Sequence, residues 1–133
     1  MNTGNVLEKD SIQIHQNLLN MYQLANDALE KALDSLETQR VDLAESVVSA
    51  DIKLNEMNRI VEKECLAMLE ERRPGGQNLR EIIASMQVAN EIERIGDHAK
   101  DIARIVLGMD PDDFSGPMEQ LMKMRDVCQN MFT

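Results

Sequence analysis

The sequence of 133 residues contains no tryptophan, one tyrosine and two phenylalanines. Charged residues make up 29% of the chain, so an all-β sandwich is a poor fit, because strands are rich in aromatic and β-branched residues. The two cysteines, Cys65 and Cys128, are 63 positions apart and form no CxxC motif. The sequence therefore predicts neither a zinc knuckle nor a disulfide framework.

Long hydrophobic runs and an N-terminal targeting signal are also missing. No apolar run approaches the roughly 18 to 20 residues that span a bilayer. The first ten residues, MNTGNVLEKD, contain neither the basic region nor the apolar region of a signal peptide. We therefore expect a soluble cytoplasmic chain, or a soluble piece of something larger.

Positive charge is scarce, since 14 Lys and Arg residues face 24 Asp and Glu residues, a formal net charge of −10. This charge repels a phosphate backbone, so we expect no nucleic-acid partner. Apolar residues make up 43% of the chain, which is enough for a core. Ten methionines stand beside very few aromatics, so that core should be aliphatic and thioether.

The three prolines, with four of the six glycines close to them, separate long segments of helical periodicity. Apolar residues recur every three or four positions over residues 6–38, 41–71 and 78–107. The connections between these segments are short, so neighbouring helices are expected to be antiparallel. The predicted fold is all-α: an up-down-up, spectrin-like three-helix bundle of long helices, each about 45 Å long, with a short fourth helix.

The third segment carries its own start and stop signals. Asn78 is a reasonable N-cap and Gly108 a reasonable end. The first part of its buried face is expected to consist of Leu79, Ile82, Ile83, Met86 and Ala89.

The end of the chain starts a new apolar pattern after a proline-containing loop. Residues 1–109 are expected to form the three-helix unit, 110–117 a linker, and 118–133 a docking helix or the first part of a second repeat. A helix this short and apolar needs a partner surface. It either closes the bundle or docks on another chain, and we expect a homodimer that buries Leu121, Met124 and Cys128.

The densest group of polar residues lies within the third helix, at residues 90–101. Glu93, Asp97 and Asp101 follow an i, i+4, i+8 spacing, so their carboxylates line one side of that helix. Gly96 inside a helix costs roughly 1 kcal/mol relative to alanine. The close approach of a neighbouring helix, or of a ligand, would explain it.

A second polar strip interrupts the apolar pattern of the second helix at Asp51, Asn55 and Asn58. Counting outward from the turn at Pro74 places Asp51 and Asp97 at similar heights in an antiparallel pair. Two interpretations stay open: a solvated face of weak ion pairs made with Arg94 or Lys100, or a carboxylate site for a hard cation such as iron, or for zinc.

Signals for catalysis are missing. Isoleucine stands three residues before both His15 and His98, so the Glu-x-x-His motif of di-iron bundles is not present. The turn at Pro74 lacks the Lys and Ser/Thr of a phosphate-binding loop, and two lone histidines define no nucleophile–base pair. We expect no enzyme.

The string ERIGDHA at residues 93–99 resembles a hallmark of the third helix in the PhoU family of phosphate-uptake regulators. Arg73-Pro74 followed by Asn78-Leu79-Arg80 is similar to the turn of that family. The resemblance covers about residues 17–108, one three-helix repeat. Residues 117–122 resemble the opening of a second repeat, and typical members of the family have two.

The resemblance implies a cytoplasmic regulator of phosphate uptake and phosphate-starvation signalling. Its expected partners are the ATPase subunit of a phosphate ABC transporter and a phosphate-sensor histidine kinase, through which alone it would reach the membrane. Candidate partner-binding residues are Arg94, His98, Met118 and Met122. Two alternatives are a metal-binding bundle without a signalling partner and a soluble domain detached from a sodium/phosphate cotransporter.

The resemblance also implies an iron or zinc site built from Glu/Asp-x-x-x-Asp motifs. Glu93 and Asp97 match one such motif. The motif on the second helix matches only at Asp51, because its second acid is Asn55 here. Asp101 stands where the family commonly has asparagine. The predicted metal ligands are therefore Glu93, Asp97, Asp51 and Asp101, with Asn55 as an incomplete match.

Overall fold

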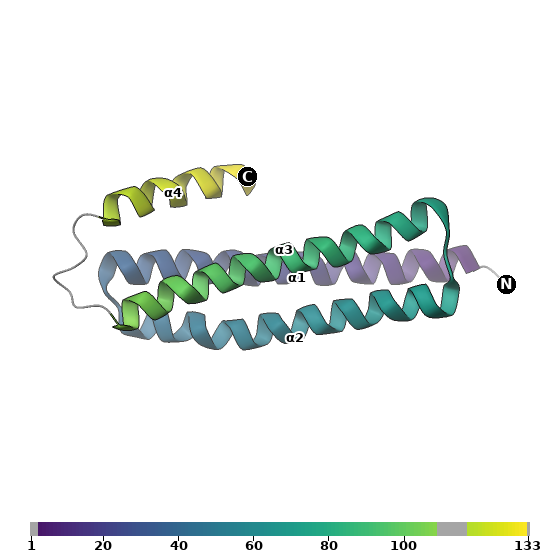
Figure 1. The fold of residues 1–133 in the computed structure, drawn as a ribbon, viewed down its shortest axis with the longest axis horizontal. Coiled ribbons are helices and arrows are strands. Elements are labelled where there is room, and N and C mark those ends of the chain that lie inside the picture. Colours follow the sequence, from purple (N-terminus) through teal and green to yellow (C-terminus); the bar gives the residue numbers. More distant parts are fainter. Residues whose placement is uncertain (1–2, 109–116, 133) are drawn as a thin grey trace.

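The computed structural model describes residues 3–108 and 117–132, with side chains described for residues 9–108 and 123–131. The elements within these ranges are four helices, α1 (Thr3–Thr38), α2 (Val41–Arg72), α3 (Gly76–Gly108) and α4 (Pro117–Phe132). The three long helices lie side by side and each contacts the other two (Figure 1). The predicted all-α, up-down-up bundle with a short fourth helix is confirmed.

Both connections within the bundle depend on the left-handed backbone region. Gln39 has a φ of 56° between α1 and α2, while Arg73 (45°) and Gly76 (59°) flank the turn between α2 and α3. Such residues reverse the chain within two or three positions. Helix α3 starts inside this turn, so Asn78 is its third residue and the predicted N-cap is wrong. The predicted end at Gly108 is confirmed.

The buried residues of α2 and α3 alternate spacings of three and four, which is the heptad pattern of a coiled coil. On α2 they are Ala44, Val47, Asp51, Leu54, Asn58, Val61, Cys65 and Met68. On α3 they are Ile82, Ser85, Ala89, Ile92, Gly96, Ala99, Ala103 and Val106. A seam of this narrow kind leaves Ile83 43% exposed, so its predicted burial is wrong.

The core has two halves of different character. The half next to the α2–α3 turn contains large side chains such as Met21, Leu54 and Ile92. The half next to the α1–α2 turn is rich in alanine, including Ala32, Ala44, Ala99 and Ala103. On α2 and α3 the two halves meet at Asp51 and Gly96, respectively. The change from large to small residues therefore occurs at the level of Asp51. The polar residues grouped there are called the polar layer below: Asp51, Asn55, Asp97 and Lys100.

Cys65 is part of the large-residue half and is fully buried. Burial, with a smaller contribution from the neighbouring Glu64 charge, raises the pKa of the Cys65 thiol to about 11. The thiol therefore stays protonated at neutral pH and packs as a small apolar side chain.

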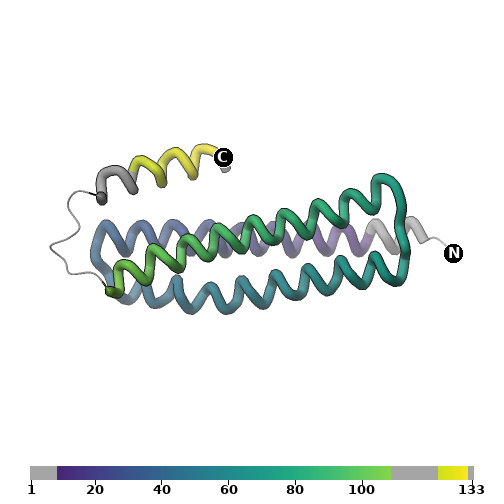
Figure 2. Tube along the Cα trace, in the orientation of Figure 1, coloured from purple at the N-terminus to yellow at the C-terminus, as the bar shows by residue number. Residues whose placement is uncertain are grey.

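Helix α4 lies beside the C-terminal half of α1 (Figure 2). The described contacts are polar: Arg125 lies 3.4 Å from Asp34 and 3.6 Å from Glu37, and Gln129 donates to Glu30 at 2.9 Å. The apolar residues Met124, Val127 and Met131 are 61%, 60% and 78% exposed. The predicted linker lies outside the described residues except for Pro117, where α4 begins.

Among the described residues, none of the helices combines the length and the hydropathy that a membrane span requires.

Candidate functional site

Asp51 is the centre of the polar layer between α2 and α3. It is only 6% exposed, and its Oδ2 accepts hydrogen bonds from Lys100 Nζ at 2.9 Å and from Asn55 Nδ2 at 3.3 Å. Lys100 comes from α3, so the ion pair bridges the two helices. A buried carboxylate needs such a partner, because an unpaired charge away from water is strongly unfavourable.

Gly96 faces the same layer from α3. A Cβ built on Gly96 would overlap the Cδ2 methyl of Leu54 and would lie 3.9 Å from Asp51 Oδ1. The missing side chain therefore makes room for Leu54, which is 1% exposed. The sequence left open whether a helix or a ligand explains this glycine, and the structure shows the close approach of α2.

Glu93 lies one turn of α3 away from Gly96 and is half-buried. It accepts a hydrogen bond from Asn58 Nδ2, and Asn58 also donates to Asn90 Oδ1 at 3.4 Å. Burial raises the pKa of Glu93, and the negative charges of Asp97 and Asp51 add to the rise. The hydrogen bond from Asn58 acts in the opposite direction.

The remaining acids of the predicted metal site lie further out. Asp97 has a side chain that is 52% exposed, and its Oδ1 lies 4.0 Å from Lys100 Nζ. Asp101 is exposed one turn further along α3. The structure thus brings Asp51, Asn55 and Asp97 together around Lys100, while Glu93 pairs with Asn58.

The candidate partner-binding residues are distributed over two helices. Arg94 and His98 are exposed on α3, and Arg94 pairs with Glu91 at 3.5 Å. Met118 and Met122 belong to α4, but their side chains lie outside the described residues. Their predicted role stays a prediction.

The arrangement of the acids does not fit a metal centre as it stands. Within the described part of the chain, no three residues among His, Cys, Asp and Glu are placed to share an ion. Lys100 Nζ is already bound to the buried carboxylate of Asp51. Two buried oxygens, Asp51 Oδ1 and Asn55 Oδ1, have no hydrogen-bond partner. Carboxylate and amide oxygens suit a hard cation as ligands, but the ammonium group of Lys100 is already bound to one of them, Asp51 Oδ2.

The pairing of Lys100 with Asp51 is the feature that sequence reasoning missed. The spacing along α3 predicts Lys100 only as a partner for Glu93 or Asp97, which share its helix. The sequence does contain a signal for this pairing. Ala44, Asp51, Asn58 and Cys65 follow one another at intervals of seven residues, which puts Asp51 and Asn58 at core positions of the heptad pattern. A charge at such a position predicts a partner from a facing helix.

The fold and the polar layer define a helical bundle domain of the coiled-coil type. The ion pair between Lys100 and Asp51 links two of its helices at the level of the polar layer. The chain belongs to the PhoU family, because the PhoU domain matches residues 18–106. This range contains α2 and nearly all of α3, together with more than half of α1.

Relatives in several bacteria support the family. A phosphate-specific transport system accessory protein PhoU homolog of Clostridium acetobutylicum is 24% identical over 130 residues, which are 97% of this chain and 59% of the relative. A homolog in Streptococcus pneumoniae is 29% identical over 90% of this chain and 55% of its own length. A homolog in Aquifex aeolicus is 30% identical over 79% of this chain and 48% of its own length. The chain spans about half the length of these relatives.

Proposed function

We propose that this chain is a cytoplasmic regulator of phosphate uptake and phosphate-starvation signalling that acts through protein contacts and not as an enzyme. The supporting observation is the PhoU match over residues 18–106, which coincides with the three-helix bundle. The matched relatives are named as accessory proteins of phosphate-specific transport. The proposed partners are the ATPase subunit of a phosphate ABC transporter and a phosphate-sensor histidine kinase.

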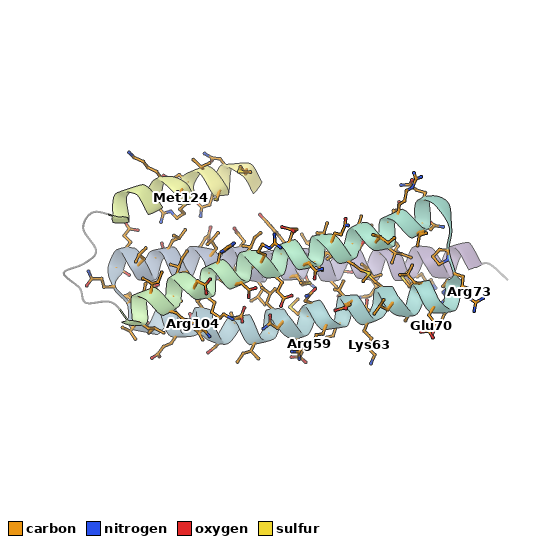
Figure 3. The ribbon with its side chains drawn as sticks, in the orientation of Figure 1. Arg59, Lys63, Glu70, Arg73, Arg104 and Met124 are labelled. Carbon is orange, nitrogen blue, oxygen red and sulfur yellow. The ribbon has the colours of Figure 1, made fainter. Side chains whose placement is uncertain are left out.

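The outward face of α2 is suited to such contacts. Ile52, Ile60 and Leu66 are large apolar side chains of this helix that are 71%, 47% and 48% exposed. Charged residues surround them, and Figure 3 shows Arg59, Lys63 and Glu70 along the outer edge of α2. A shallow hollow on this face is lined by Arg59, Glu62, Lys63, Leu66, Ala67 and Glu70. Apolar anchors within a charged rim are common in protein–protein interfaces.

The proposal includes a homodimer formed through α4. This helix directs Arg125 and Gln129 toward α1 and leaves Met124, Val127 and Met131 exposed. An apolar row that faces away from its own bundle is stabilised when another surface covers it. The predicted metal dependence stays a prediction and forms no part of this proposal.

A binding experiment with purified proteins tests the proposed partners. We expect the chain to bind the phosphate transporter ATPase subunit, and we expect Leu66→Glu combined with Ile52→Glu to weaken binding about tenfold or more, as for anchor residues. The matched control is Ile12→Glu, which places the same charge on a residue of α1 that is 64% exposed.

A genetic experiment tests the regulation. Deleting the gene should raise expression of a phosphate-starvation reporter in phosphate-rich medium, and the wild-type chain should restore repression. The proposal is wrong if the chain binds neither the ATPase subunit nor the kinase and the deletion leaves the reporter unchanged.

A further inference from the structure

The polar layer between α2 and α3 contains one cation that belongs to the chain itself. Lys100 Nζ lies 2.9 Å from Asp51 Oδ2 and 4.0 Å from Asp97 Oδ1, and the Lys100 side chain is 22% exposed. The ammonium group therefore lies between a carboxylate that is 94% buried and one at the rim of the layer. Asn55 donates to the same oxygen of Asp51, at 3.3 Å.

The same layer contains more oxygen acceptors than its donors satisfy. Asp51 Oδ1 and Asn55 Oδ1 are both buried and have no hydrogen-bond partner. Buried acceptors of this kind are uncommon, because each forgoes the hydrogen bonds that water would provide. Carboxylate and amide oxygens are also the ligands that hard divalent cations prefer. The layer thus has unused capacity to bind a cation.

Lys100 opposes the binding of a second cation there. Two like charges separated by a few ångströms repel strongly where water is largely excluded. A divalent ion placed on Asp51 would therefore have to displace the ammonium group or remain near it. A lysine side chain is tethered to the layer, so it competes with a dissolved ion at a high effective concentration.

We propose that Lys100 is the built-in counter-ion of this layer, and that it weakens divalent metal binding at Asp51 and Asp97 by occupying their shared position. In the native chain the ion pair joins α2 to α3, and the ammonium group of Lys100 neutralises the carboxylate of Asp51 without a metal. Removing the ammonium group leaves a net negative, oxygen-rich layer that binds a divalent ion. The inference concerns the bundle alone and does not depend on the proposed function.

The experiment compares Mn²⁺ binding to the purified wild-type chain and to Lys100→Gln by isothermal titration calorimetry. Mn²⁺ is the probe because it prefers oxygen ligands, which reduces binding at histidine or cysteine. We expect Lys100→Gln to bind Mn²⁺ at least tenfold more tightly than the wild-type chain. Lys63→Gln, which removes a lysine that points away from the bundle on α2, should not change the affinity (Figure 3).

A double variant assigns the new affinity to this layer. Adding Asp51→Asn to Lys100→Gln should return Mn²⁺ binding to the wild-type level, because it removes the central carboxylate. Circular dichroism checks that each variant is folded. If Lys100→Gln does not fold, Lys100→Met replaces it, since methionine preserves the apolar stem of the side chain.

Two results would overturn the proposal. One is a folded Lys100 variant that binds Mn²⁺ no more tightly than the wild-type chain. The other is a gain that persists with Asp51→Asn, because the ion would then be bound elsewhere.

Discussion

Gly96 provides the space in which Leu54 packs between α2 and α3. Alanine at this position would gain about 1 kcal/mol of helix propensity but would force a fully buried leucine to move. Overpacking of this kind costs about 1–3 kcal/mol. We therefore expect Gly96→Ala to lower the free energy of unfolding by up to about 2 kcal/mol, measured by urea denaturation.

Gly108 is the matched control, since a Cβ built there has no heavy atom within 4 Å. Gly108→Ala should leave the free energy of unfolding within about 0.5 kcal/mol of the wild type, as for surface substitutions. The explanation of Gly96 fails if the two variants are equally stable.

The ionisation of Glu93 makes the stability of the bundle depend on pH, and this contribution to stability decreases as the pH rises. Its pKa is raised by burial and by the nearby charges of Asp97 and Asp51, so the folded chain holds this proton more tightly than the unfolded chain. The stability that Glu93 contributes therefore falls as pH rises from its ordinary pKa of 4.5 through the raised pKa. Glu93→Gln removes this titration and still offers an oxygen to Asn58.

We expect Glu93→Gln to be more stable than the wild type at neutral pH, and the difference to shrink as the pH falls to about 4. Urea denaturation at several pH values measures this difference. Glu91→Gln, on a side chain that is 66% exposed, is the control for a change of net charge. A difference that stays constant across the pH range would contradict the assigned direction.

Helix α4 depends on a few polar contacts for its position against α1. Arg125 reaches two acids of α1, and Gln129 reaches a third. Exposed ion pairs contribute about 0.2–1 kcal/mol each, so this attachment is weaker than the packing inside the bundle. Arg125→Gln should therefore loosen α4 and leave α1, α2 and α3 intact.

Hydrogen exchange tests this expectation. Amide exchange in α4 should become several-fold faster in Arg125→Gln, as loss of about 1 kcal/mol predicts, while exchange in the three long helices should not change. Lys123→Gln removes an exposed positive charge from the same helix and serves as the control. Equal exchange in the two variants would show that Arg125 does not hold α4.

At the scale of the whole molecule, the exposed row on α4 predicts self-association. The sequence predicted burial of Leu121, Met124 and Cys128; Cys128 is half-buried, Met124 is 61% exposed, and the side chain of Leu121 lies outside the described residues. We expect the wild-type chain to sediment as a dimer and Met124→Glu combined with Val127→Glu to sediment as a monomer. Charges on an apolar contact of this kind cost several kcal/mol of association.

Ile12→Glu is the control for the dimer, because it adds a charge to an exposed residue of α1 that comes before the part bound by α4. It should remain a dimer in analytical ultracentrifugation. A wild-type chain that is monomeric at micromolar concentration would refute the dimer.

The sequence by itself determined the number of long helices, their order and their turns. Apolar periodicity specifies a helix locally, and the turn residues around Gln39 and Pro74 need no distant contact to reverse the chain. The string at residues 93–99 was also sufficient to point to the PhoU family, which the match over residues 18–106 confirms. All of these signals are local in the chain.

Only the tertiary structure decided which side chains meet across the helices. Lys100 pairs with Asp51, Glu93 with Asn58, and Leu54 fills the space beside Gly96. These contacts depend on the rotation and the axial register of each helix, and a change of one residue moves a side chain by about 100°. Because the buried seam repeats at 3.5 residues, Ile83 lies outside it, although the apolar pattern alone predicts that Ile83 is buried.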